Sequence, residues 1–139
     1  MRYTLHWGPD NARRITTVAE LEGLLSFLTT VRGRDGAPHG VDLLPAGVDE
    51  GGLQLGIGHP QRAFVVWLDA GAAPGTGGSY GIDDDLEAWP EPIGFDCGVD
   101  VVDFKPAWTR VTPRQAVQAA REYVVTGARP TCLRFDPDA

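Results

Sequence analysis

The sequence predicts an α+β fold, in which a mostly antiparallel sheet of five to seven strands packs against two helices in a single two-layer domain, residues 1–139. Apolar residues recur at helical spacing in one segment near each end of the chain. Between these segments, short apolar runs alternate with glycine and proline, and their spacing favours an antiparallel meander. The length of 139 residues, with 42% hydrophobic and 22% charged residues, suits one globular core.

The N-terminal segment is expected to form a strand followed by a helix. Residues 3–7 alternate larger apolar side chains with threonine and histidine, the pattern of a half-buried strand. A helix is predicted over residues 17–31, because Thr17 and Glu20 form a capping-box pattern ahead of apolar residues at helical spacing. Gly33 is expected to end this helix.

Four apolar segments in the middle of the chain predict successive strands. Residues 41–44 form the first, and residues 53–57 alternate so that their leucines and isoleucine share one face. Residues 62–69 are apolar on both faces, which indicates a central strand. The glycine-rich residues 71–78 predict a flexible loop, and residues 80–82 a short strand after it.

The C-terminal third is expected to hold three more strands. Residues 93–97 and 99–104 predict two strands that meet near Gly98, and residues 131–135 predict a short final one.

A second helix is predicted between these strands. Thr112 supplies the N-cap, Pro113 the first helical residue and Gln115 the third position of a capping box, and Gly127 ends the helix. Alanines in its apolar stripe allow close approach to the sheet. The residues expected to be buried are Ala116, Ala119, Ala120, Tyr123 and Val124.

The formal net charge of −7 argues against nucleic acid and anionic membranes as partners, because both are bound mainly by clustered lysine and arginine. A basic protein partner is the better expectation. No run of roughly 18 apolar residues occurs, so no membrane-spanning helix is expected. A turn at Gly8 precedes any signal-like apolar stretch, and a cytoplasmic protein is therefore expected.

The patterns typical of cofactor and metal sites are incomplete. The glycine-rich residues 56–61 and 75–80 lack the last glycine and the lysine of a phosphate-binding loop. Residues 83–87 alternate acidic side chains as a calcium loop does, but Ala88 and Gly94 stand where that loop needs glycine and glutamate. The three histidines are twenty or more residues apart, unlike paired zinc ligands. No metal or cofactor is expected.

Cys97 and Cys132 are expected to be free thiols, because disulfides are rare in cytosolic proteins. A triad of Cys97, a histidine and an aspartate would make the protein a small cytosolic hydrolase or ligand-binding domain with a concave pocket. No nucleophile signature surrounds Cys97, so we expect a protein that is not an enzyme and keep this class as the alternative. A domain that assembles only with itself is a third possibility.

The most unusual feature of the chain is its acidic segment, residues 80–104. This segment contains no lysine, arginine or histidine and holds eight of the nineteen acidic residues, so its field should be strongly negative. A tryptophan lies among these charges, as in an interface anchor surrounded by steering charges. The residues expected to contact a partner are Tyr80, Asp83, Asp84, Asp85, Glu87, Trp89 and Glu91.

Both parts of this interpretation have a structural alternative. A solvated loop can tolerate the self-repulsion of the carboxylates. Trp89 can fold back as a lid on the core. The sequence leaves both alternatives open.

Several segments together have the pattern of a known protein family. They are Arg62 to Asp69, Phe95 with Gly98, Thr109 to Pro113, Gln115 with Ala116, Ala119 to Tyr123, Thr126 to Pro130 and Leu133 to Phe135. The most specific part is the second predicted helix with the Thr-Gly-x-Arg-Pro motif that follows it. These segments cover about half of the chain, and they resemble the first immunity protein family of the bacterial polymorphic toxin systems.

The resemblance implies a non-enzymatic antidote encoded beside a secreted toxin, frequently one with a nucleic-acid deaminase domain. The chain lacks the His-x-Glu and Pro-Cys-x-x-Cys elements of zinc deaminases, so it fits the blocker and not the toxin. We therefore expect an immunity protein that binds a cognate toxin domain, a deaminase or nuclease, and occludes its basic active-site region.

Overall fold

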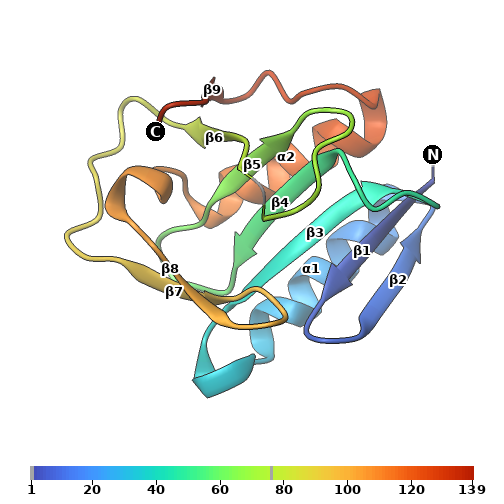
Figure 1. Ribbon diagram of the computed structural model, residues 1–139, viewed down its shortest axis with the longest axis horizontal. Helices are drawn as coiled ribbons and strands as arrows, with labels where there is room; N and C mark the ends of the chain where they lie inside the picture. The colour runs from blue at the N-terminus through green and yellow to red at the C-terminus, as the bar shows by residue number, and fades with distance from the viewer. Residues whose placement is uncertain (1, 76) are drawn as a thin grey trace.

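The computed structural model describes residues 2–75 and 77–139, and within them the chain forms two α-helices, two short 3-10 helices and nine strands (Figure 1). The α+β class, with two helices and a mostly antiparallel sheet, is confirmed. The predicted count of five to seven strands is too low. Thr76, in the loop predicted over residues 71–78, lies outside the described residues.

Seven strands form one antiparallel path in the order β2-β1-β3-β4-β5-β6-β9. The strands β3 to β6 follow one another in space as they do in the chain, which confirms the predicted meander. The N-terminal hairpin forms one edge, and β9 pairs with β6 at the other. Their bounds are β1 (Tyr3–Trp7), β2 (Asn11–Ile15), β3 (His39–Pro45), β4 (Gly52–Ile57), β5 (Val65–Leu68), β6 (Ser79–Ile82) and β9 (Arg134–Asp136).

The strand that the sequence prediction missed is β2. Only Ile15 of its five residues is buried, so the segment carries no alternating apolar signal. It becomes a strand because the turn at Gly8 (φ 60°) folds it back onto β1, where Tyr3 pairs with Ile15. Backbone pairing on an edge, and not burial of side chains, makes this strand.

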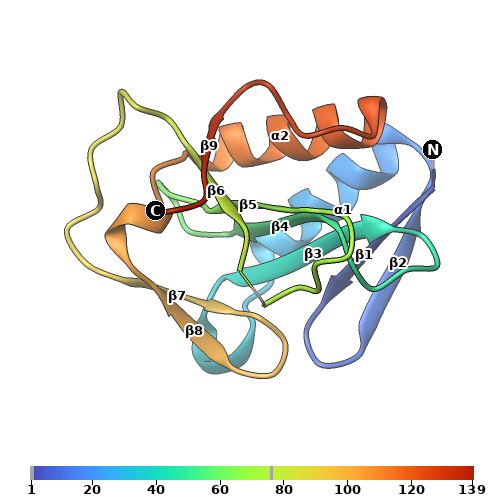
Figure 2. The ribbon, with the colours of Figure 1, turned by 45° about the horizontal axis from the view of Figure 1, so that its top comes forward.

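Both helices cover the same face of the sheet (Figure 2). α1 (Val18–Thr30) begins at Thr17, whose hydroxyl accepts a hydrogen bond from the backbone N–H of Glu20 at 3.1 Å. α2 (Pro113–Thr126) begins with the predicted capping box and ends at Gly127, whose φ of 72° suits glycine. Within the described residues, neither helix is long and apolar enough to cross a membrane.

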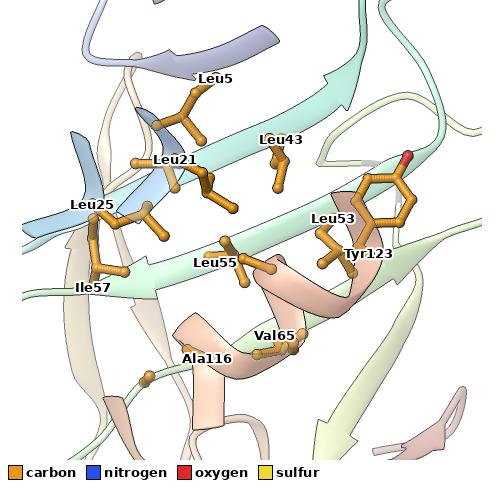
Figure 3. Close-up of a cluster of buried hydrophobic side chains, with 14 of the residues drawn as sticks. Leu5, Leu21, Leu25, Leu43, Leu53, Leu55, Ile57, Val65, Ala116 and Tyr123 are labelled. Carbon is orange, nitrogen blue, oxygen red and sulfur yellow. The ribbon is translucent and has the colours of Figure 1, made fainter. Parts of the chain in front are cut away.

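One hydrophobic core fills the space between the helices and the sheet (Figure 3). Leu53, Leu55 and Ile57 of β4 all point into it, as their alternation predicted. Each large aliphatic side chain buried here contributes on the order of 1.5–3 kcal/mol. The predicted stripe of α2 is buried as well, namely Ala116, Ala119, Ala120, Tyr123 and Val124.

A β-hairpin covers part of the opposite face of the sheet. It consists of β7 (Ile93–Asp96) and β8 (Val101–Phe104), and it joins the main sheet through one parallel bridge between His39 and Asp96. In Figure 2 the hairpin and the helices lie on opposite sides of the sheet. The sequence predicts two layers, helices and sheet, and the hairpin forms a partial third layer on the other face of the sheet.

Aromatic rings form a second, smaller core under the hairpin. Phe64 stacks on Phe104 with ring centroids 4.0 Å apart and meets Phe95 edge-on at 5.0 Å. Gly56 of β4 lies against this cluster, where a Cβ atom would be only 2.3 Å from the Phe64 ring and 2.7 Å from the Phe95 ring. The absence of a side chain at Gly56 therefore lets the rings pack directly on the sheet.

Candidate functional site

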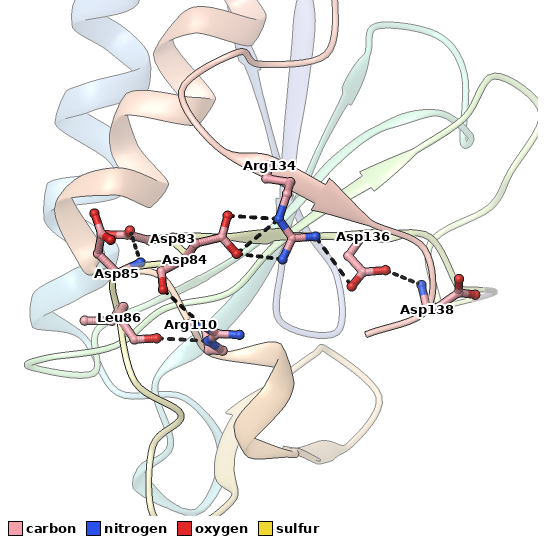
Figure 4. A network of polar contacts seen from close by, with 8 residues as sticks. All are labelled: Asp83, Asp84, Asp85, Leu86, Arg110, Arg134, Asp136 and Asp138. Carbon is pink, nitrogen blue, oxygen red and sulfur yellow. Dashed lines mark hydrogen bonds and ion pairs between the residues drawn. The ribbon is translucent and has the colours of Figure 1, made fainter.

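Most residues predicted to contact a partner lie in the connection from β6 to β7, and we call residues 83–91 the acidic strap. Arginines from other segments hold it in place (Figure 4). Arg110 Nε donates to the carbonyl oxygen of Leu86 at 2.9 Å, and Arg134 donates to both carboxylate oxygens of Asp84 at 2.7 and 2.9 Å. The acidic strap is thus pinned to the domain, and part of its negative charge is compensated by the chain itself.

Trp89 packs against the second core beside a buried arginine. The Arg62 guanidinium lies 5.0 Å from the centroid of the Trp89 ring, and the His59 ring meets Trp89 edge-on at 5.3 Å. Arg62 also donates to the carbonyl oxygens of Glu87 at 2.6 Å and Thr109 at 3.2 Å. This packing has the form of the lid alternative. Trp89 stays partly exposed, so its contact with a partner remains a prediction.

Two carboxylates of the acidic strap are engaged within the chain. Asp83 accepts hydrogen bonds from the side-chain amide of Gln115 at 2.8 Å and from the backbone N–H of Asp85 at 3.0 Å. The bond from Gln115 lowers the pKa of Asp83, and the bonds from Arg134 lower the pKa of Asp84. Both groups therefore stabilise the strap, which reduces their availability to a partner.

Six of the seven residues predicted to contact a partner belong to the acidic strap, and Tyr80 lies outside it. Tyr80 belongs to β6 and stacks on Trp108, with centroids 5.0 Å apart and an interplanar angle of 6°. Within the described residues, three carboxylates of the acidic strap are exposed and make no side-chain hydrogen bond or ion pair: Asp85, Glu87 and Glu91.

The face of the sheet opposite the helices carries a partly polar row across five strands. His6 of β1 is opposite Asp42 of β3, and Asp42 is opposite Gln54 of β4. The row continues from Gln54 to Val66 of β5 and on to Tyr80 of β6. For the first four of these residues, the neighbours along the strands pack in the helix-side core, so their side chains lie on the other face. Tyr80 shares this face because it pairs with Val66.

Two adjoining hollows lie along this row, and we call them together the open-face groove. The larger has a volume of about 490 Å³ and the smaller about 340 Å³. Gln54 lines the first and Asp42 the second, and the Gln54 amide donates to Asp42 at 3.0 Å between them. The main lining side chains are His6, Asp42, Gln54, Val66, Tyr80 and Trp108.

Asp42 is the carboxylate at the middle of the open-face groove. Burial raises its pKa, although the hydrogen bond from Gln54 and the nearby His6 act in the opposite direction. The sequence prediction missed this group. Its signal is the position of Asp42 and Gln54 between apolar residues of alternating strands, where they face away from the helices.

The structure gives little support to the alternative in which Cys97 is a catalytic nucleophile. Cys97 lines the larger hollow, but burial and the carboxylates of Asp42 and Asp96 raise the pKa of its thiol to about 12. The thiol is therefore protonated at neutral pH. In the part of the chain that the structure describes, no histidine hydrogen-bonds to Cys97, and no group of three or more His, Cys, Asp or Glu residues is placed to bind a metal ion. Cys132 is also a free thiol.

The residues that carry the family resemblance have framework contacts. The Glu122 carboxylate accepts from the backbone N–H of Thr131 at 2.6 Å and so holds the chain that returns after α2. Arg62 joins the acidic strap to the segment at Thr109, as described above. Gly127 provides the left-handed turn at the end of α2. These residues stabilise the shape of the domain, and other residues form most of its exposed surface.

Comparison with known proteins identifies a matching family. The family model described as immunity protein Imm1 matches residues 10–137. No curated protein matches the chain. The matched range includes both helices, the acidic strap and every strand except β1.

Proposed function

The chain belongs to the immunity protein Imm1 family, and on this premise we propose that it binds the toxin domain of a cognate toxin and neutralises it. The family match over residues 10–137 is the observation that carries the proposal. Such a protein acts by occupying its partner and needs no catalytic residue. The raised pKa of the Cys97 thiol agrees with this mode of action.

We further propose that the toxin is an enzyme acting on nucleic acid, a deaminase or a nuclease, and that the protein meets it in the cytoplasm. Such an enzyme must bind a polyanion, so the rim of its active site is expected to be basic. The net charge of −7 gives the protein the opposite potential, which accelerates encounter and favours occlusion of that basic region.

Within this proposal, the exposed carboxylates of the acidic strap make the first contacts with the toxin. The side-chain carboxylates of Asp85, Glu87 and Glu91 have no partner within the described residues, so binding a basic surface disrupts no existing pair. The strap is held by arginines and needs little ordering on binding, which lowers the entropic cost of association. Asp84 and Trp89 are poor probes of contact, because replacing either disturbs the strap itself.

The test is protection of growing cells that express the toxin domain encoded beside the protein's own gene. The probe variant is Asp85→Asn, Glu87→Gln and Glu91→Gln, which removes three unpaired charges and leaves the arginine contacts in place. A matched control, Asp35→Asn, Glu50→Gln and Asp100→Asn, changes the net charge equally at exposed positions outside the strap.

The wild type and the control variant are expected to protect the cells, and the probe variant to protect them less. If the wild type does not protect, the proposed function is wrong. If the probe and the control protect equally, the acidic strap is not the contact surface. Rim charges act mostly on the association rate, so the loss should be largest at low levels of the protein.

A further inference from the structure

The open-face groove differs from the acidic strap in being a hollow built on paired strands. Its floor is the row from His6 to Tyr80, whose side chains are fixed by the register of five strands. The two hollows, about 490 and 340 Å³, meet at the hydrogen-bonded pair of Asp42 and Gln54. A hollow of this size with a floor of paired strands is typical of binding sites.

The charge around the smaller hollow selects a cation. Asp10, Asp42 and Asp49 all line it, and among the described residues no lysine or arginine lines either hollow. Within the described part of the chain, Asp42 accepts a hydrogen bond only from Gln54, although a carboxylate has about four acceptor positions. A guanidinium group can fill the remaining positions with two parallel N–H donors.

The other end of the open-face groove offers an apolar wall. Tyr80 stacks flat on Trp108, and the Lys105 ammonium lies 4.8 Å from the centroid of the same indole. Val66 completes the wall on the side of the sheet. An apolar side chain is the natural occupant of this end.

The distance between Asp42 and the apolar wall determines the size of the occupant. Three strand spacings of about 4.8 Å separate Asp42 from Tyr80, or about 14 Å in all. A single arginine side chain does not span this length. Roughly four to five residues of extended chain do.

We propose that the open-face groove receives a protruding segment of the toxin, in which an arginine pairs with Asp42 and an apolar residue a few positions away packs against Tyr80 and Trp108. This inference rests on the proposed function and identifies a second contact surface, on the sheet. Burial of the Asp42 carboxylate gives the pairing more strength than an exposed pair would have. The acidic strap then steers the toxin, and the groove retains it.

The test is the dissociation constant of the purified complex with the toxin domain encoded beside the gene, measured by calorimetry for the wild type and for Asp42→Asn. Asparagine keeps an oxygen that can accept the Gln54 hydrogen bond, so the fold is expected to persist. Removing one partner of a buried charge pair should weaken binding by about 30-fold or more. Glu22→Gln, which removes an exposed carboxylate on the helix side, serves as the control and should bind as the wild type does.

Equal affinity of Asp42→Asn and the wild type would overturn the groove proposal and leave the proposed function standing. If the wild type forms no complex, the proposed function fails, and NMR titration with N-acetyl-arginine methylamide decides on the groove. Shifts of the Gln54 side-chain amide that vanish in Asp42→Asn and with the neutral citrulline analogue would support it. The absence of such shifts would overturn it.

Discussion

The two faces of the sheet are built by alternate residues of the same strands, yet they have different properties. On β4, Leu53 and Leu55 enter a core that both helices cover. Between and beside them, Gln54 lies in the open-face groove and Gly56 lies under the aromatic rings of the hairpin. The helix-covered face is therefore buried along the whole strand. The other face is buried at Gly56 and forms part of an accessible hollow at Gln54. This contrast suggests that stability depends mainly on the first face and partner binding on the second.

The largest effect is expected on the helix side, from Leu55→Ala. Leu55 is fully buried between the sheet and the helices, so the variant loses apolar burial and leaves a cavity. The free energy of unfolding should fall by about 2–5 kcal/mol in denaturant titration. A loss below about 1 kcal/mol would show that this core is not the main source of stability.

An intermediate effect is expected one residue further along, from Gly56→Ala. The new methyl group would lie 2.3 Å from the Phe64 ring, so the rings under the hairpin must shift. The expected loss is about 1–3 kcal/mol in the free energy of unfolding. Gly23→Ala is the control, since α1 has open space there and alanine favours the helix by roughly 0.5–1 kcal/mol. If both variants are more stable than the wild type, the aromatic rings under the hairpin do not pack against Gly56, which would contradict the structure.

The smallest effect on stability is expected in the groove, from Asp42→Asn. The pKa of Asp42 is raised above its unfolded value of about 3.8, so the folded wild type loses stability as the pH rises through this range. Asparagine carries no such cost. The variant should match the wild type at low pH and equal or exceed its stability at pH 7, as denaturant titrations at both pH values can show. A variant clearly less stable at pH 7 would mean that the Asp42 carboxylate supports the fold.

Local patterns in the sequence predict the helix-covered face well. The capping residues Thr17 and Thr112 stand where the helices begin, and the alternation along β4 assigns its leucines to the core. Such signals depend on neighbours within a few positions, which is why they can be read from one chain. The edge strand β2 escaped prediction because it is made by pairing and not by its own pattern.

The candidate site depends on contacts between distant positions, which no local pattern contains. Arg134 is 50 residues from Asp84, and Arg62 is 25 residues from Glu87, so the partial neutralisation of the acidic segment could not be foreseen. In the sequence, Asp42 and the other members of the polar row are recognisable only as polar residues within apolar strand segments. The register of the sheet determines which of these polar residues lie next to one another and leaves them outside the area that the hairpin covers.

The central claim, that this acidic Imm1 protein neutralises a basic toxin by direct binding, is tested most directly by the association rate of the two purified proteins at increasing ionic strength. We expect a tight complex whose association rate falls at least tenfold between about 20 mM and 500 mM salt, because screening removes the attraction between oppositely charged surfaces. A rate that is independent of salt, or no complex at all, would contradict this account.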